Sequence, residues 1–344
     1  MKTQLNLKDL AAQIMDRASK KEDFIADTRS MAYDPTRNEL QVGNRGYVVN
    51  DHAHGQIATH TGIPCAYYKR MREEAPRLLA DNIKQWFDAY PSNRMVRTLD
   101  NGARAFLSDK YNRMDDDAFA NVVLPAIFET PGAEVVSCGL TDIKTTIKFK
   151  SPRKTREVKK GDEVQFGVAF SNSEVGAGRL TGSLFCYRLV CLNGMVIEEE
   201  QFASTHVGKK HMSRDLGEIF QLDTVKADGE ATILKLRDFT KTLLTDQFID
   251  AQVAKMQGLA EVRIEDPVKT VEKLAKQHSF ADAQRNDVLK HLIEGGDLSL
   301  WGLANAVTRT AEDQPDYDDA TRLETLGGRM LTLPHSEYRQ LQAA

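Results

Sequence analysis

Residues 143–170 read IKTTIKFKSPRKTREVKKGDEVQFGVAF, and the order of side chains in this stretch decides the central part of the fold. Residues 143–150 alternate strictly, with Ile, Thr, Ile and Phe at odd positions and Lys, Thr, Lys and Lys at even positions. This period of two is typical of a β-strand with one buried face and one cationic face. Residues 163–170 repeat the apolar alternation, whereas the basic residues 151–160 predict an exposed loop. We therefore expect an antiparallel pair of strands with a cationic side.

Turn signals and strand patterns extend this pair in both directions. Short strand-like pieces occur at 30–33, 39–42 and 46–49, and Asn101-Gly102 is a strong signal for a two-residue hairpin turn. Residues 180–192 are apolar on both faces, as in a central strand. The predicted fold class is α+β, with an antiparallel, β-rich central region, flanking helices and a helical C-terminal part.

Helical periodicity is found before, between and after these strands. Because a chain of 344 residues exceeds the usual size of a single core, we expect two regions. Residues 1–212 would form an α+β core domain with a basic, β-rich middle, and residues 213–344 a helical C-terminal region. Residues 314–344 are polar and are expected to be loosely held. Helices are predicted at 5–20, 51–90, 115–128, 233–256, 267–277, 281–293 and 298–311.

Charge is distributed unevenly along the chain. The segment from Lys144 to Arg214 contains 13 Lys and Arg against 7 Asp and Glu, so it carries +6, while the remainder carries −10 and the whole chain −4. A cationic middle in an acidic protein indicates a local anion site, because successive Lys and Arg can neutralise successive phosphates. The alternative is a solvated hairpin whose charges keep a sheet edge from aggregating. The candidate nucleic-acid-binding residues are Lys144, Lys148, Lys150, Arg153, Lys154, Arg156, Lys159, Lys160, Arg188, Lys209, Lys210 and Arg214.

A second motif, QIATHTGIPCAYYKRM at residues 56–71, contains two short helical stretches around Gly62. A glycine at the turn between two helices is favoured in helix-turn-helix units that bind DNA. Lys69, Arg70 and Arg72 would then lie on the second helix. The alternative is an ordinary helical hairpin with no ligand.

Catalytic and metal-binding patterns are weak. Cys186, Cys191, His206 and His211 follow the order of a Cys2His2 zinc site, but the two cysteines are five residues apart in one expected strand and would point to opposite faces. No metal and no other cofactor is therefore predicted. Cys191 and His206 could pair as nucleophile and base, although a buried structural thiol is the preferred interpretation. Neither a phosphate-binding glycine loop nor a G-x-G-x-x-G motif occurs, so an enzyme is not the expected class.

Three stretches together resemble a known family: RAFLSDKYNRMDDD at 104–117, GDEVQFGVAFSNSEVGAG at 161–178 and YRLVCLNGM at 187–195. They are similar, in this order, to the phage and plasmid proteins grouped as domain of unknown function 932. The resemblance covers about residues 55–208. It implies an association with mobile elements and hence a role in DNA replication, recombination or defence. Strands with a cationic face followed by a long helix are also similar in order to the single-strand annealing proteins of phages.

These observations predict a DNA-binding protein of a phage or plasmid, acting without ATP to bind or anneal single-stranded DNA in recombination. Annealing without a nucleotide motor needs many subunits, and residues 233–256 offer an apolar helix for packing, so a homo-oligomer is expected. The alternative is a mobile-element interaction protein that binds a host protein through its helical C-terminal region. No apolar run approaches the roughly 20 residues needed to span a bilayer. The N-terminus resembles no signal or transit peptide, so no membrane partner and a cytoplasmic location are expected.

Overall fold

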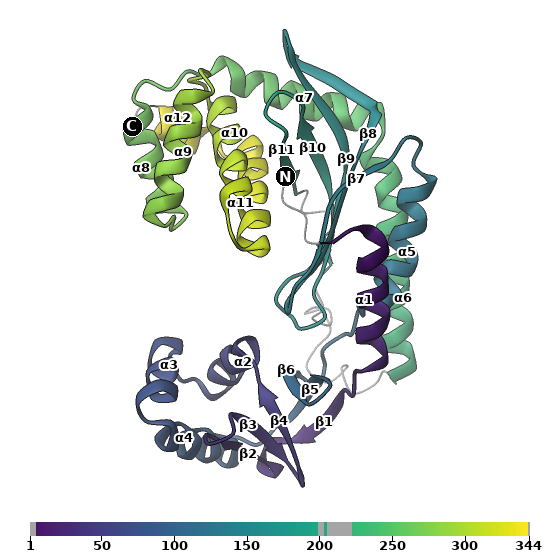
Figure 1. Ribbon diagram of the computed structural model, residues 1–344, viewed down its shortest axis with the longest axis vertical. Coiled ribbons are helices and arrows are strands. Elements are labelled where there is room, and N and C mark those ends of the chain that lie inside the picture. The colour runs from purple at the N-terminus through teal and green to yellow at the C-terminus, as the bar shows by residue number, and fades with distance from the viewer. Residues whose placement is uncertain (1–4, 199–202, 205–221, 343–344) are drawn as a thin grey trace.

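The computed structural model describes residues 5–198, 203–204 and 222–342, and its strands form two separate sheets (Figure 1). The first sheet and three helices form an N-terminal lobe, residues 24–108. The second, here called the central sheet, has helices on both of its faces. The fold is therefore α+β, with an antiparallel central sheet and a helical C-terminal part, as the sequence predicts.

The N-terminal lobe is a mixed sheet of six strands in the order β1-β5-β6-β4-β3-β2, and only β4 and β6 run parallel. The three short strands and the hairpin that the sequence predicts are present as β2, β3, β4 and the β5–β6 pair. Ile57, Ile83 and Phe87 are completely buried and attach the helices to the sheet. The elements are β1 (Phe24–Asp27), β2 (Met31–Asp34), β3 (Glu39–Val42), β4 (Arg45–Val49), α2 (Asp51–Thr61), α3 (Cys65–Glu74), α4 (Pro76–Ala89), β5 (Asn93–Leu99) and β6 (Gly102–Ser108).

The central sheet has the order β11-β10-β9-β8-β7, with the short β12 also paired to β10, and every pairing is antiparallel. The prediction of a loop at residues 151–160 is wrong, because residues 151–159 continue β8, although several of them are exposed. The register of β8 against β9 shifts between Ser151 and Thr155, so an irregularity absorbs the extra residues and pairing resumes as far as Lys159. The strands are β7 (Glu134–Leu140), β8 (Thr145–Lys159), β9 (Asp162–Asn172), β10 (Leu180–Arg188), β11 (Asn193–Ile197) and β12 (Ala203–Ser204).

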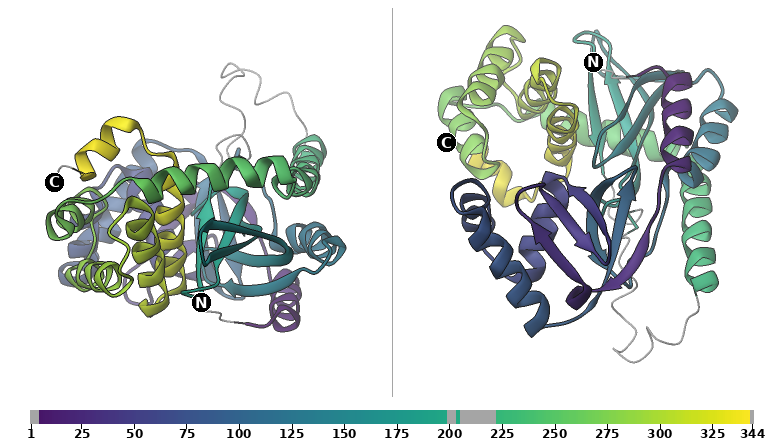
Figure 2. Two further views of the ribbon diagram at one scale, coloured as in Figure 1. Left: turned by 90° about the horizontal axis from the view of Figure 1, so that it is seen from above. Right: turned by 60° about the horizontal axis from the view of Figure 1, so that its bottom comes forward.

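Helices cover the central sheet from two sides. In Figure 1, α1, α5 and α6 lie on one side and α10 and α11 on the other, and Figure 2 shows α7, in green, running across the sheet between α6 and the remaining C-terminal helices. None of the described helices is both long enough and apolar enough to cross a membrane. The helices are α1 (Leu7–Ser19), α5 (Asp116–Glu129), α6 (Leu222–Leu243), α7 (Asp246–Glu261), α8 (Pro267–Gln277), α9 (Asp282–Glu294), α10 (Leu300–Thr310), α11 (Tyr317–Arg329) and α12 (His335–Gln342).

Two details of the helical part differ from the sequence prediction. The helix expected over residues 233–256 is two helices, because α6 ends at Leu243 and the Thr245 hydroxyl caps α7 by accepting the Phe248 N–H. Most apolar residues of this segment are buried within the chain and Leu234 alone of the large ones is exposed, so the segment offers no free apolar face to support self-association. The polar end of the chain is not loosely held over α11, where Tyr317 and Leu323 are buried.

Packing divides the described chain differently from the expected boundary at residue 212, which itself lies outside the described residues. One hydrophobic core belongs to the N-terminal lobe. A larger core is shared by α1, α5, the central sheet and the C-terminal helices. The C-terminal helices therefore complete the central sheet, because each face of a buried sheet needs an apolar cover.

Close approach of α11 to β11 depends on Gly328. A Cβ atom at this position would lie 1.9 Å from the carbonyl oxygen of Val196, so the helix can sit this close only without a side chain there. We expect Gly328→Ala to lower the free energy of unfolding by about 1–3 kcal/mol through overpacking, measured by urea denaturation. Gly258→Ala is the control, because Gly258 of α7 has no atom within 4 Å of its Cβ position. That change should raise stability by up to about 1 kcal/mol, the helix-propensity difference. Equal effects of the two changes would contradict the close contact.

Candidate functional site

The even-numbered side of β8 is buried at Thr146 and Lys148, which corrects the expectation of an exposed cationic face over residues 144–150. Lys148 is 1% exposed, and its ammonium forms an ion pair with Glu324 of α11 and a 3.1 Å hydrogen bond to the Thr321 hydroxyl. Burial alone would lower the pKa of Lys148, but the Glu324 carboxylate holds that pKa above its ordinary value. Lys148 is thus charged and paired inside the protein. Its place is structural, and a phosphate outside the protein does not reach it in this arrangement.

Lys144 and Lys150, at either end of the same face, are half-buried. The ammonium of Lys150 donates to the Gln165 side-chain oxygen at 2.7 Å and lies 3.5 Å from a Glu134 carboxylate oxygen. It also lies 4.8 Å from the centre of the Tyr187 ring. Lys150 is therefore held by three different side chains and contributes little accessible positive charge.

Arg188 is likewise an internal link rather than a surface cation. Its guanidinium donates to both carboxylate oxygens of Asp162, with an Nη2–Oδ2 distance of 2.8 Å. The same carboxylate accepts the indole N–H of Trp301 at 2.9 Å. Arg188 and Asp162 therefore join the end of β10 to the start of β9 and to α10.

The cations that face solvent are gathered at the far end of β8 and the turn to β9. We call this set the basic edge: Arg153, Lys154, Arg156, Lys159 and Lys160. Arg153 and Lys160 are exposed and have no ion-pair partner among the described residues. The side chains of Lys154 and Arg156 are each 28% exposed, and that of Lys159 is 44% exposed. Of the candidate nucleic-acid-binding residues that the structure describes, these five form one accessible group, and Lys144 is partly accessible before the other end of β8.

Three members of the basic edge contact acidic residues of the C-terminal region, two on α7 and one in the loop between α9 and α10. Lys154 and Arg156 lie 3.1 Å and 2.8 Å from the carboxylate of Asp246. Arg156 also lies 2.6 Å from Asp250, and Lys159 2.6 Å from Asp297. Together with Lys148, four of the ten described cations between residues 144 and 188 are therefore paired with carboxylates from the end of the chain.

Three candidate cations, Lys209, Lys210 and Arg214, lie outside the described residues, as do His206 and His211 of the zinc pattern. Cys186 is buried within the core, and burial raises the pKa of its thiol well above the ordinary value. Cys191 is half-buried in the turn after β10. Within the part of the chain that the structure describes, no group of three His, Cys, Asp or Glu side chains is arranged to hold a metal ion.

The helix-turn-helix pattern corresponds to real helices. Gly62 has φ +68 and ends α2 in the left-handed conformation that favours glycine, and α3 follows three residues later. Lys69 and Arg70 of α3 are exposed, whereas Arg72 is paired with Asp51 at 2.8 Å. Two helices joined by a glycine turn are therefore present, as both the helix-turn-helix and the helical-hairpin interpretations expect, and a DNA-binding role for α3 stays a prediction.

The sequence interpretation missed a buried charge cluster where the N-terminal lobe meets the central sheet. We call it the junction cluster, and its members come from the segment before β1, from β5, β6, the start of α5 and the loop after β9. Glu174, 3% exposed, lies at its centre and forms ion pairs with Lys21 and Arg104. The cluster comprises Lys21, Asp23, Arg97, Arg104, Asp115, Asp116 and Glu174.

Arg97 connects the two sides of the junction. Its guanidinium donates to Asp23 at 2.9 Å and 2.7 Å, to the main-chain carbonyl of Glu174 at 2.7 Å, and also pairs with Asp115. Burial alone would lower the pKa of Arg97, but Asp115 and Asp23 raise it, so the guanidinium remains charged at 0% exposure. One fully desolvated cation thus holds the segment before β1, the start of α5 and the loop after β9.

The two buried carboxyls of the junction have opposite pKa shifts. Burial would raise the pKa of Glu174, but Arg104, Lys21 and Arg97 lower it to about 2. Burial and the neighbouring Glu174 charge raise the pKa of Asp116 to about 7. With Asp116 protonated, three cations balance three carboxylates in the cluster. The hollow beside Asp116 has a volume of only about 10 Å³, which is room for one water molecule, so the carboxyl is placed for packing and not for contact with a substrate.

Two of the three family-like stretches meet at this junction. Residues 104–117 supply Arg104, Asp115 and Asp116, and residues 161–178 supply Glu174. The third stretch, residues 187–195, supplies Arg188 to the separate contact with Asp162. The signal in the sequence that could have predicted this cluster is the presence of Arg, Asp and Glu inside these stretches. The sequence alone does not reveal that two stretches about 60 residues apart share one buried site.

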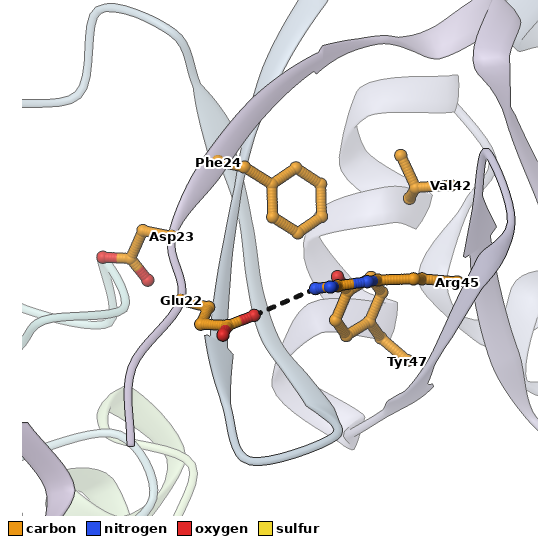
Figure 3. Close-up of a pocket in the computed structure, with 6 residues that line it drawn as sticks. All are labelled: Glu22, Asp23, Phe24, Val42, Arg45 and Tyr47. Atoms are coloured by element: carbon orange, nitrogen blue, oxygen red, sulfur yellow. Dashed lines mark hydrogen bonds and ion pairs between the residues drawn. The ribbon is translucent and has the colours of Figure 1, made fainter. Parts of the chain in front are cut away.

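A hollow on the N-terminal lobe lies next to the junction, beside Asp23 (Figure 3). It has a volume of about 280 Å³ and is lined by Glu22, Asp23, Phe24, Val42, Arg45 and Tyr47. Arg45 and Glu22 face each other across it at 3.1 Å. These two charges satisfy each other, so the hollow presents no unpaired group that would select a ligand.

Comparison with protein families, with curated proteins and with solved structures finds no match to this chain. Membership of the family grouped as domain of unknown function 932 stays a prediction.

The role of Lys148 can be tested by removing one partner and then both. Lys148→Met should lower the free energy of unfolding by about 3–5 kcal/mol, because it leaves Glu324 buried without a counter-charge. Lys148→Met with Glu324→Leu should restore most of that loss, since an apolar pair of similar volume needs no counter-charge. Urea denaturation measures both. A single variant as stable as the parent protein would contradict the buried pair.

Asp116 predicts a specific dependence of stability on pH. Its pKa of about 7 in the folded protein lies above the ordinary 3.8, so the folded state holds a proton that the unfolded state releases between these values. The contribution of Asp116 to stability is therefore complete below about pH 4 and is lost as pH rises through 7. Asp116→Asn cannot ionise, so its stability relative to the parent should increase from pH 4 to pH 7.5. A difference that is constant across this range in urea denaturation would contradict the raised pKa.

Proposed function

We propose that the protein binds nucleic acid, and single-stranded DNA in particular, through the basic edge. The observation that carries this proposal is the presence of five solvent-accessible cations within residues 153–160, on one strand end and the adjoining turn. Along an extended strand, alternate residues are about 6.6 Å apart and point the same way. Lys154 and Arg156 can therefore meet separate phosphates of an extended strand.

Ion pairs at the basic edge are weak enough to be exchanged for phosphates. Their acidic partners Asp246 and Asp250 are 66% and 59% exposed, and such surface pairs contribute about 0–1 kcal/mol each. The pairs of Lys148 and Arg188 are different, because Glu324 and Asp162 are buried and cannot be released without leaving an uncompensated charge. The proposed contact surface is thus smaller than the sequence alone suggests and is confined to the hairpin end.

The wider biological setting is part of the same proposal. We propose an ATP-independent role in the recombination of a phage or plasmid, supported by the resemblance of residues 104–117, 161–178 and 187–195. Self-association remains an expectation from the annealing role. Light scattering of the purified protein with and without DNA would measure its mass directly.

Replacing all five residues of the basic edge with Gln tests the proposal. The variant Arg153→Gln/Lys154→Gln/Arg156→Gln/Lys159→Gln/Lys160→Gln keeps the buried residues of β8, so stability should change by no more than about 0.5 kcal/mol per site. If all five meet phosphates, the slope of log affinity against log salt should flatten by up to about 3.5, at roughly 0.7 per contact on a single strand. Fluorescence anisotropy with labelled oligothymidylate measures that slope.

A matched variant removes five exposed cations from the N-terminal lobe and the turn that follows it: Arg37, Lys69, Arg70, Arg77 and Lys110. It changes net charge equally and should keep the parental salt slope. An unchanged slope in the basic-edge variant, or no binding by the parent protein at low salt, would contradict the proposal. Loss of binding in the N-terminal variant instead would move the site to α3 and its helix-turn-helix arrangement.

A further inference from the structure

Carboxylates of the C-terminal helices occupy the positions that phosphates would take at the basic edge. Asp246 and Asp250 are one turn apart on α7, so their side chains project from the same face of the helix. Between them they contact Lys154 at 3.1 Å and Arg156 at 2.8 Å and 2.6 Å. A row of two negative groups therefore already lies along the cationic strand end.

We infer that α7 is an intramolecular competitor of nucleic acid, whose Asp246 and Asp250 carboxylates must leave Lys154 and Arg156 before phosphates bind. This inference rests on the proposed function, because it concerns the regulation of the same site. A carboxylate and a phosphate oxygen both accept charge-assisted hydrogen bonds from guanidinium and ammonium groups. The two anions therefore compete for the same donors. The free energy of nucleic-acid binding at these donors is only the difference between the phosphate and the carboxylate interactions.

Competition of this kind needs no movement of the helix. Ile249, Val253 and Met256 are buried in the shared core and anchor the side of α7 that adjoins the two aspartates. Asp246 and Asp250 lie on the exposed face, so a change of side-chain rotamer is enough to release the cations. The two states of the site then differ in surface contacts alone, and the fold remains the same in both.

The arrangement also selects among anions. Arg153 and Lys160 have no ion-pair partner among the described residues, so a ligand can meet them without displacing a carboxylate. A ligand with several linked phosphates can first contact these two cations. Its neighbouring phosphates then lie close to Lys154 and Arg156, so they displace Asp246 and Asp250 in an intramolecular step. A polyanion such as a single strand therefore overcomes the competition that an isolated phosphate does not.

The test compares the binding of labelled oligothymidylate by the parent protein, by Asp246→Asn/Asp250→Asn and by Asp282→Asn/Asp319→Asn. The last variant is a matched control, because Asp282 and Asp319 are exposed acids near helix starts that pair with Arg285 and Arg322 of their own helices. Both double variants remove two negative charges. The α7 variant should bind about threefold to tenfold more tightly at low salt, as expected from the loss of two weak surface competitors. Its salt slope should steepen, while the control should stay within about twofold of the parent.

The possible outcomes separate the inference from the proposed function. Binding by the parent protein with equal affinities for all three proteins would overturn the competition by α7 and leave the basic edge as the binding site. Equal gains in both double variants would also overturn it, because they would reflect net charge alone. No binding by any of the three proteins would overturn the proposed function and the inference together. Thermal unfolding of each variant confirms that it is folded before binding is compared.

Discussion

Burial of both faces of β8 over residues 145–149 is the constraint on which the rest of the structure depends. The strand pairs with β7 and β9, one face packs Ile147 and Phe149 into the core, and the other is covered by α11. Because this part of the strand is enclosed, water does not reach the Lys148 ammonium. The covering helix α11 must therefore supply an anion, and Glu324 is that anion. The position of α11 and the main core of the protein follow from the same requirement.

The junction cluster likewise neutralises buried charges, here between the N-terminal lobe and the central sheet. Arg97 and Glu174 are both fully or almost fully desolvated, and each would be costly without its partners. Because their partners come from several segments, the cluster also fixes how the lobe is oriented. Burial and the Glu174 charge raise the pKa of Asp116, so its carboxyl adds less negative charge to a site in which three cations meet four carboxyls.

Lysine and arginine therefore have different roles at different places in this protein. Where the ion pair is buried, as for Lys148 and Arg188, it holds the fold and is not exchangeable. Where it is exposed, as for Lys154 and Arg156, water competes with it and a stronger or multivalent anion can replace it. Solvent access, and not the number of positive charges in a segment, decides which cations can serve a ligand.

The sequence by itself determined the α+β class, the alternation of β8 and β9, the short strands of the N-terminal lobe, and the turn at Gly62. These features depend on near neighbours, through side-chain period and turn chemistry. It did not reveal that β8 continues past Ser151, that α11 is well packed, or that Lys148 is buried. Only the tertiary structure decided these points, together with the junction cluster and the pairing of α7 with the basic edge. The physical reason is that burial and charge neutralisation depend on residues distant in sequence, such as Lys148 and Glu324, whose contact no local pattern encodes.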